Sequence, residues 1–314
     1  RRQRQMCIRD RGNLDLSENG YAKIFELGIN SPEVLFAVEF KSSVIDHAYD
    51  AYVRPSGDTK ELGKQVYSGF VPTSELVDSY EMAGDGGNFS WEKHGKDPYA
   101  NREPRFYATI LYNGADWMGR KIESFVGGKD GYKAYENAGA AGTTVTGYYL
   151  RKYLIDGDKT WVTSGSGQDW IVLRYAEVLL NKAEALAMEN WNKNSAEALQ
   201  ALNDVRARVG LPARATADKE TFLEYVRHER KVELAGEGFR YWDLRRWRLA
   251  EKVIDGQNVH GVKISKQSDG SFTYEQVDAD GGHKRIFYDR YYRFAIPLSE
   301  RSNNSLCTNN DGWI

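Results

Sequence analysis

Hydrophobic and small residues recur at spacings of three and four over residues 170–188, a period that predicts a helix with one apolar face. The same period returns over residues 194–209, where Asn194 stands at the position of an N-cap residue. Because only a short turn separates the two stretches, we expect them to form an antiparallel helical hairpin. Such a hairpin needs a neighbouring element to cover its second apolar face.

Two more helices are predicted over residues 219–235 and 239–249, and the glycines between them mark the boundary. The four predicted helices therefore make two hairpins in series at about residues 169–250. This arrangement is typical of tetratricopeptide repeats, although the sequence does not keep their strict period. The fold class that follows is mainly α, with tetratricopeptide-like helical hairpins, long irregular loops and a few short strands.

The helical period is absent between residues 41 and 166, where Gly, Tyr, Asp and Asn are frequent and only brief apolar runs interrupt them. The apolar run at 33–40 predicts a buried strand, and short strands with a polar tail are predicted over 251–314, including the run at 288–297. Long loops inside a compact domain are usually functional. We therefore expect the ligand to bind within about residues 41–166.

Charge and composition exclude several classes of function. The chain has 43 Lys and Arg against 45 Asp and Glu, so it lacks the basic excess of a nucleic-acid-binding protein. No apolar run approaches the roughly 18 residues of a membrane-spanning helix. Cys7 and Cys307 are too few for a disulfide framework or a metal cluster, and the sequence shows no cofactor motif, nucleophile elbow or zinc helix. We expect no enzyme activity and no cofactor.

Residues 1–11 read RRQRQMCIRDR, a run with five Arg, no apolar periodicity and no hydrophobic core of a signal peptide. We interpret this run as a non-native or artefactual segment and expect the folded region to be residues 12–314. The natural N-terminus, with any targeting signal, is then expected to lie upstream of this sequence.

Five groups of motifs carry a specific resemblance, because they occur in one order along most of the chain. Together they resemble the C-terminal portion of the SusD/RagB family, the surface glycan-binding lipoproteins of Bacteroidetes nutrient-uptake systems. The motifs are SPEVLFAVEF, then DPYANREPRFYATILYNGADW, then LRYAEVLLNKAEALAMEN with NSAEALQALNDVRARVGLP, then VRHERKVELAGEGFRYWDLRRW, and finally YYRFAIPLSERSNNSLCTNNDGW.

One motif departs from the family pattern, which usually reads Arg-Asp-Pro-Arg where this chain has Arg102-Glu103-Pro104-Arg105. We expect Arg102 and Arg105 to fix loops through hydrogen bonds to carboxylates or carbonyls rather than to touch a ligand.

The family resemblance implies a non-enzymatic protein at the outer membrane and cell surface. Such a protein captures an oligosaccharide and passes it to a TonB-dependent, SusC-like transporter. The resemblance also implies further helices and a lipidated cysteine upstream of this chain. Cys7 is not that cysteine, because the residues before it do not form a lipobox.

Sugars present flat C–H faces flanked by hydroxyls, so their binding sites combine aromatic rings with amides, carboxylates and guanidinium groups. The loop-rich region supplies this mixture. Trp117 is the leading candidate, because it follows a turn-forming Asn-Gly pair and has little local apolar sequence to bury its ring. The other predicted ligand-binding residues are Tyr80, Trp91, His94, Tyr99, Asn113, Asp116 and Arg120.

Two alternative functions remain open at this point. Some relatives of this family bind oligopeptides, so the ligand could be a peptide. The helical hairpins could also form a protein-interaction scaffold without a soluble ligand. Exposed aromatic rings in one cleft of loops would favour a sugar, a cleft of charges and open strand edges would favour a peptide, and rings that are all buried would favour a scaffold.

Overall fold

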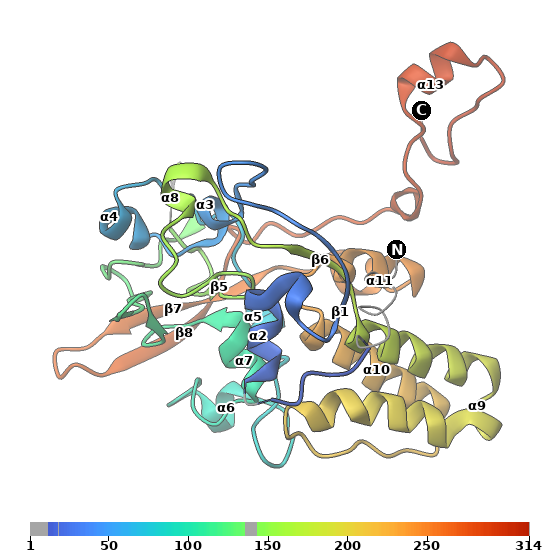
Figure 1. Ribbon diagram of the computed structural model, residues 1–314, viewed down its shortest axis with the longest axis horizontal. Helices are drawn as coiled ribbons and strands as arrows, with labels where there is room; N and C mark the ends of the chain where they lie inside the picture. Colours follow the sequence, from blue (N-terminus) through green and yellow to red (C-terminus); the bar gives the residue numbers. More distant parts are fainter. Residues whose placement is uncertain (1–11, 18, 136–142, 314) are drawn as a thin grey trace.

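A computed structural model of the protein describes residues 12–17, 19–135 and 143–313, so the predicted non-native segment 1–11 lies outside the described residues. Most ordered elements are helices (Figure 1), and none of those described is both long and apolar enough to cross a bilayer. The helices are α2 (Gly20–Leu27), α3 (Tyr49–Val53), α4 (Asp58–Leu62), α5 (Ser74–Val77), α6 (Trp91–His94), α7 (Pro104–Thr109), α8 (Trp161–Ser164), α9 (Tyr175–Arg208), α10 (Lys219–Glu233), α11 (Phe239–Arg246), α12 (Ala250–Ile254) and α13 (Leu298–Asn303), with 3-10 turns η1 (Gly28–Asn30) and η3 (Asp289–Tyr292).

The strands form small antiparallel pairs, and no larger sheet is found among the described residues. The pairs are β1 (Val34–Val38) with β6 (Trp170–Arg174), β2 (Ile110–Leu111) with β5 (Tyr149–Leu150), β3 (Asp116–Trp117) with β4 (Arg120–Lys121), and β7 (His260–Lys266) with β8 (Phe272–Asp278).

The predicted first hairpin is present as α9, whose two halves meet at a break where Asn190 has extended backbone angles. The apolar faces of α9 and α10 form one hydrophobic cluster. The predicted N-cap is wrong: Asn190, not Asn194, caps the second half, because its Oδ1 accepts a hydrogen bond from the Lys193 amide at 3.2 Å. The cluster includes Ala176, Leu180, Ala183, Ala187, Leu202, Val205, Phe222 and Val226.

The predicted start of this hairpin is also wrong, because residues 170–174 are strand β6 rather than helix. β6 pairs with β1, with Ile171 opposite Ala37, so the strand predicted at 33–40 is confirmed. Its predicted burial is wrong on one face, where Phe36 is 55% and Val38 44% exposed. A two-stranded ribbon covered on one side explains this alternation.

The chain after α10 is less regular than predicted. The helix expected over 239–249 ends early, at Arg246, as α11, and a separate helix α12 starts at Ala250, because Arg248 adopts a left-handed backbone conformation between them. Trp242 on α11 is 55% exposed. The hairpin β7–β8 confirms two of the predicted C-terminal strands, but residues 288–297 form no strand; they include η3 and extend from the body of the molecule, where no described strand pairs with them (Figure 1).

Buried ion pairs join the helices to the loop region. Arg102 donates to the carbonyls of Val77 (2.6 Å), Tyr80 (2.9 Å) and Pro98 (3.0 Å). Arg105 pairs with Glu103 at 2.6 Å, and also with two glutamates of α10. The expectation that both arginines fix loops is therefore confirmed.

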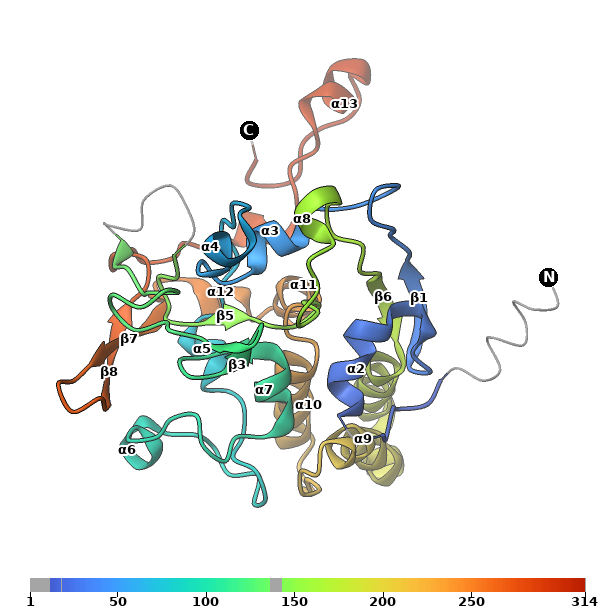
Figure 2. The same cartoon turned by 60° about the vertical axis from the view of Figure 1, so that its left-hand side comes forward.

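Short helices of the loop region lie together at the far end of the molecule from the α9–α10 hairpin. In both views α3, α4 and α8 cluster at one end, while α9 and α10 lie side by side at the other (Figures 1 and 2). The loops between these short helices thus have a surface of their own, away from the helical scaffold.

Candidate functional site

Exposed aromatic rings gather around the short helix α3. Tyr52 on α3 is 44% exposed, and Tyr67 and Phe70 in the following loop are 45% and 65% exposed. The rings of Tyr52 and Tyr67 stack with centroids 5.1 Å apart, and the Phe70 ring meets Tyr52 edge-on at 6.2 Å. We call these three rings the aromatic surface. A cavity of about 330 Å³ adjoins it, lined by Phe40, His47, Ala48, Tyr49, Tyr52, Phe70 and Trp170.

Backbone hydrogen bonds hold the three rings on one face. The Tyr67 amide donates to the Ala51 carbonyl at 2.7 Å, and the Phe70 amide donates to the Tyr52 carbonyl at 3.2 Å, so the loop runs along α3. Between them Ser68 takes a left-handed conformation, and its hydroxyl donates to the Arg54 carbonyl at 2.9 Å. The loop is therefore pinned at both aromatic positions and at the turn between them.

Arg54 anchors the end of α3 that carries this loop. Its side chain is fully buried, and its guanidinium donates to Asp50 Oδ1 at 2.7 Å and to the carbonyl of Asp158 at 3.1 Å. The same guanidinium lies 5.2 Å from the ring centroids of Trp117 and Trp161. The aromatic surface thus rests on a fixed charged group rather than on a mobile loop.

Trp117, the leading residue predicted from the sequence, belongs to this support. The expectation of an exposed ring is wrong, because Trp117 is 1% exposed and its indole N–H donates to Asp58 Oδ2 at 3.0 Å. The ring packs in one hydrophobic cluster with Leu111, Ala115 and Ile122, which are close by in the chain, and with Val53, which lies about 60 positions earlier. A ring without a free face cannot stack on a sugar in this conformation.

Arg120 shares the same carboxylate. It pairs with Asp58 at 2.8 Å and with Asp130 at 2.6 Å, and its side chain is 13% exposed. Burial works to lower the pKa of Arg120, but the two aspartates outweigh it and raise that pKa above its ordinary value. Arg120 is therefore committed to structural ion pairs.

Three further predicted residues lie apart from the aromatic surface. Tyr80 is fully buried, so the expectation of an accessible ring there is wrong. Trp91 is half-buried, and its indole N–H donates to Asp78 Oδ2 at 2.9 Å. The half-buried His94 stacks on Phe89 with centroids 5.5 Å apart. The structure places Trp91 and His94 together on α6, a short helix away from α3.

Asp116 is exposed and forms an ion pair with Lys121 at 2.7 Å on the β3–β4 hairpin. Among the described residues, its side chain forms no hydrogen bond or ion pair with another predicted ligand-binding residue. Such an exposed pair is typical of a solvated surface.

Tyr99 and Asn113 are two predicted residues that the structure brings together at one cavity. Both line a cavity of about 370 Å³, which we call the tyrosine pocket, although they are only 6% and 7% exposed. Asn113 Oδ1 has no hydrogen-bond partner among the described residues. The pocket is also lined by Asp97, Ala100, Tyr107, Tyr112, Gly114, Phe272 and Tyr274. Ligand binding by Tyr99 and Asn113 stays a prediction.

Sequence reasoning missed the three rings of the aromatic surface, because it ranked Trp above Tyr and Phe. The available signal was the segment from Tyr67 to Phe70, which reads YSGF and places two aromatic residues on either side of a Ser-Gly turn. Tyr52, 15 positions before Tyr67, gave no local sign that it would join them.

Comparison with known proteins identifies the class to which this fold belongs. The model of the SusD family matches residues 32–313, which is most of the chain, so the chain belongs to the SusD family. The resemblance inferred from the motifs and the mainly helical, SusD-like fold are thereby confirmed.

Two solved structures from Bacteroides fragilis are similar over nearly the whole chain. A SusD-like carbohydrate-binding protein is 26% identical, with a TM-score of 0.75 over 96% of this chain and 59% of its own length. A SusD-like protein is 25% identical, with a TM-score of 0.72 over 98% of this chain and 61% of its own length. The SusD-like protein P38 of Formosa agariphila is 32% identical over 133 residues, 39% of this chain and 25% of that protein. The chain thus spans about three fifths of these solved relatives.

Proposed function

We propose that this chain belongs to a cell-surface glycan-binding protein that captures an oligosaccharide at the aromatic surface. Binding is non-covalent, and the protein is not an enzyme. The captured glycan is passed to a TonB-dependent, SusC-like transporter in the outer membrane, and a lipid anchor holds the whole protein at that membrane. Membership of the SusD family and the similarity to a carbohydrate-binding protein support this proposal.

The exposed rings of Tyr52, Tyr67 and Phe70 are the observation that carries the proposal. An aromatic ring that covers the apolar C–H face of a pyranose stabilises the complex, and a tyrosine hydroxyl at the ring edge can form a hydrogen bond with a sugar hydroxyl. Since Tyr52 and Phe70 also line the adjoining cavity, one sugar unit can lie on the rings while its neighbour enters the cavity.

The two rival functions are less well supported by the same rings. Exposed rings by themselves also fit a protein-interaction scaffold, but the adjoining cavity of about 330 Å³ offers room for part of a soluble ligand. A peptide site would need charged groups and an open strand edge, whereas the residues lining the adjoining cavity are aromatic apart from Ala48.

Glycan binding is tested with an array of oligosaccharides, with oligopeptides on the same array as the control ligands. The variants Tyr52→Ala, Tyr67→Ala and Phe70→Ala are compared with Trp242→Ala, which removes an exposed ring from α11. Each stacked ring contributes about 1 kcal/mol, so each of the three variants should raise the glycan Kd about fivefold. Trp242→Ala should bind like the original protein.

Two results would overturn the proposal. If the array retains only peptides, the ligand is a peptide rather than a sugar. An equal loss of glycan binding in Trp242→Ala would show that the effect does not come from the aromatic surface.

A further inference from the structure

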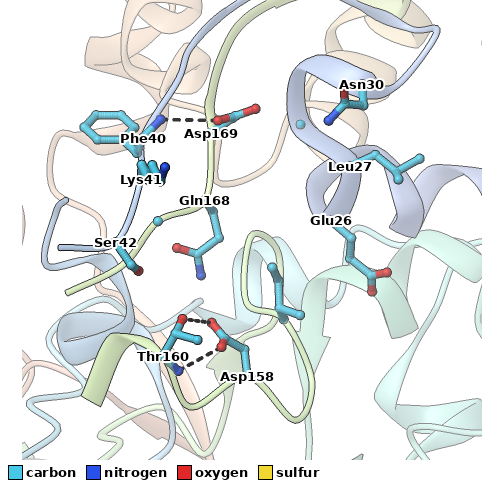
Figure 3. Close-up of a pocket in the computed structure, with 13 residues that line it drawn as sticks. Glu26, Leu27, Asn30, Phe40, Lys41, Ser42, Asp158, Thr160, Gln168 and Asp169 are labelled. Carbon is cyan, nitrogen blue, oxygen red and sulfur yellow. Dashed lines mark hydrogen bonds between the residues drawn. The ribbon is translucent and has the colours of Figure 1, made fainter. Parts of the chain in front are cut away.

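A polar cavity lies beside the aromatic surface and shares Phe40 with the cavity that adjoins it. It measures about 520 Å³ and is enclosed by α2 and η1 on one side and by residues 40–42, 155–160 and 167–169 on the other (Figure 3). Phe40 thus borders both cavities, so the polar cavity and the cavity beside the aromatic surface are neighbours.

Gln168 points into this cavity and has an unused hydrogen-bond acceptor (Figure 3). The side chain is 7% exposed, and its Nε2 donates to Asp50 Oδ2 at 2.8 Å. That bond orients the amide, so Oε1 is the atom left without a partner among the described residues. A buried acceptor without a partner is costly, so a donor that reached it from the cavity would be stabilised.

Carboxylates dominate the charge of the cavity. The Asp169 carboxylate accepts hydrogen bonds from the backbone amides of Ile29 (2.9 Å) and Phe40 (3.3 Å). Asp158 accepts from the Thr160 amide at 2.8 Å and from its hydroxyl at 3.1 Å (Figure 3).

Glu26 is the third carboxylate of the cavity and is exposed, and Lys41 is the single ammonium group in its lining. No described side chains form a cluster suited to a metal ion. The lining therefore carries three negative charges against one positive charge.

We infer that the polar cavity is a second sugar subsite that accepts neutral or amino sugars and discriminates against uronate and sulfated sugars. This inference rests on the proposed glycan function. Hydroxyl and ammonium groups donate hydrogen bonds to the carboxylates and to Gln168, whereas an anionic sugar meets like charge. At separations of a few ångström near a protein surface, such repulsion weakens binding about tenfold, and salt reduces it.

The inference is tested with a glycan array in which neutral, amino and uronate oligosaccharides share the same linkages and lengths. We expect neutral and amino glycans to bind about tenfold more tightly than their uronate counterparts at low salt, and the ratio to shrink at 0.5 M salt, roughly where charges on the surface are screened. The double variant Glu26→Gln/Asp158→Asn should recover most of the lost uronate affinity. Asp116→Asn, which neutralises an exposed carboxylate on the β3–β4 hairpin, should leave the ratio unchanged.

The outcomes separate this inference from the proposed function. If uronate glycans bind best and Tyr52→Ala still weakens them, the inference is wrong and the glycan function stands. If the ratio is the same in the double variant as in the original protein, the polar cavity is not the source of the selectivity. If no glycan is retained, both the inference and the proposed function are overturned.

Discussion

Replacing Arg174 by Leu should destabilise the protein strongly at neutral pH. The Arg174 side chain is 1% exposed, and its guanidinium pairs with Glu33 at 2.8 Å and with Glu233 and Glu237 at 2.7 Å each. These carboxylates belong to the start of β1, to α10 and to the turn after α10. A single guanidinium therefore joins the strand pair to the helical scaffold, and its loss leaves buried carboxylates with too little positive charge.

The expected loss is about 3–5 kcal/mol, the usual cost of removing one partner from a buried ion pair. Native domains have total stabilities of about 5–15 kcal/mol, so the loss is a large fraction of the whole. The loss of unfolding free energy also depends on pH. Burial works to raise the pKa of Glu233, but Arg208, Arg174 and Arg105 outweigh it and hold that pKa well below its ordinary value.

The sign of the pH effect follows from this lowered pKa. In the original protein the stability that Glu233 contributes is fully present above about pH 4.3, the unfolded pKa, and is lost as the pH falls toward the folded pKa. In Arg174→Leu the carboxylates are less well paired, so protonation relieves them. The difference in unfolding free energy between the two proteins should therefore shrink on acidification.

Urea unfolding, followed by tryptophan fluorescence and circular dichroism, measures this difference at pH 7.5 and at about pH 3.5, below the unfolded pKa of glutamate. Lys121→Met is the control, because it breaks the exposed pair with Asp116 and should cost less than about 0.5 kcal/mol. A loss below about 1 kcal/mol for Arg174→Leu, or an equal loss at both pH values, would refute the reasoning. Should Arg174→Leu not fold, Glu237→Gln perturbs the same group more mildly and is measured in the same way.

Three further predictions concern single buried positions. Burial lowers the pKa of Lys152 to about 8, so its contribution to stability should rise between about pH 8 and the unfolded pKa of about 10.4; thermal melts of Lys152→Met should lack this rise, and parallel pH curves would contradict it. Trp117→Phe loses the indole hydrogen bond and should lower the free energy of unfolding in urea by about 1–3 kcal/mol, while the folded protein still binds glycan. Loss of binding at unchanged stability would show instead that Trp117 contacts the ligand. Gly147→Ala would place a Cβ 2.2 Å from the Val262 carbonyl oxygen and should cost more than Gly63→Ala, which meets no atom within 4 Å at a similar backbone angle; equal melting temperatures would contradict this.

The helical scaffold could be predicted from the sequence because its stabilising contacts are local in period. Ala176, Leu180 and Ala183 lie on one face whatever the rest of the chain does. The same period failed at residues 170–174, where an apolar run fits a helix and a strand equally well. What decides for the strand is pairing with β1, about 136 positions earlier, and spacing within one segment carries no information about such a partner.

At the candidate site, too, contacts with distant segments decide which residues are buried, and local sequence does not reveal them. Local sequence placed Trp117 after a turn, yet its ring packs in a hydrophobic cluster and lies beside Asp58 and Arg54 of a distant segment. The cluster includes Leu111, Ala115 and Ile122, but only the folded chain shows that these residues and Val53 enclose the ring. Polar contacts explain why Tyr52 and Tyr67 are exposed. Arg54 and Ser68 direct their polar groups to carboxylates and backbone carbonyls, so the two rings lie on the outer face of α3.

The polar network under α3 thus fixes which aromatic rings are free to bind. Asp50 connects Arg54, which supports the aromatic surface, to Gln168, which points into the polar cavity. One buried carboxylate therefore orients a group at each of the two adjoining sites. A ligand that spans both sites meets positions that are already set before it binds, and this preorganisation reduces the ordering cost that otherwise weakens carbohydrate recognition.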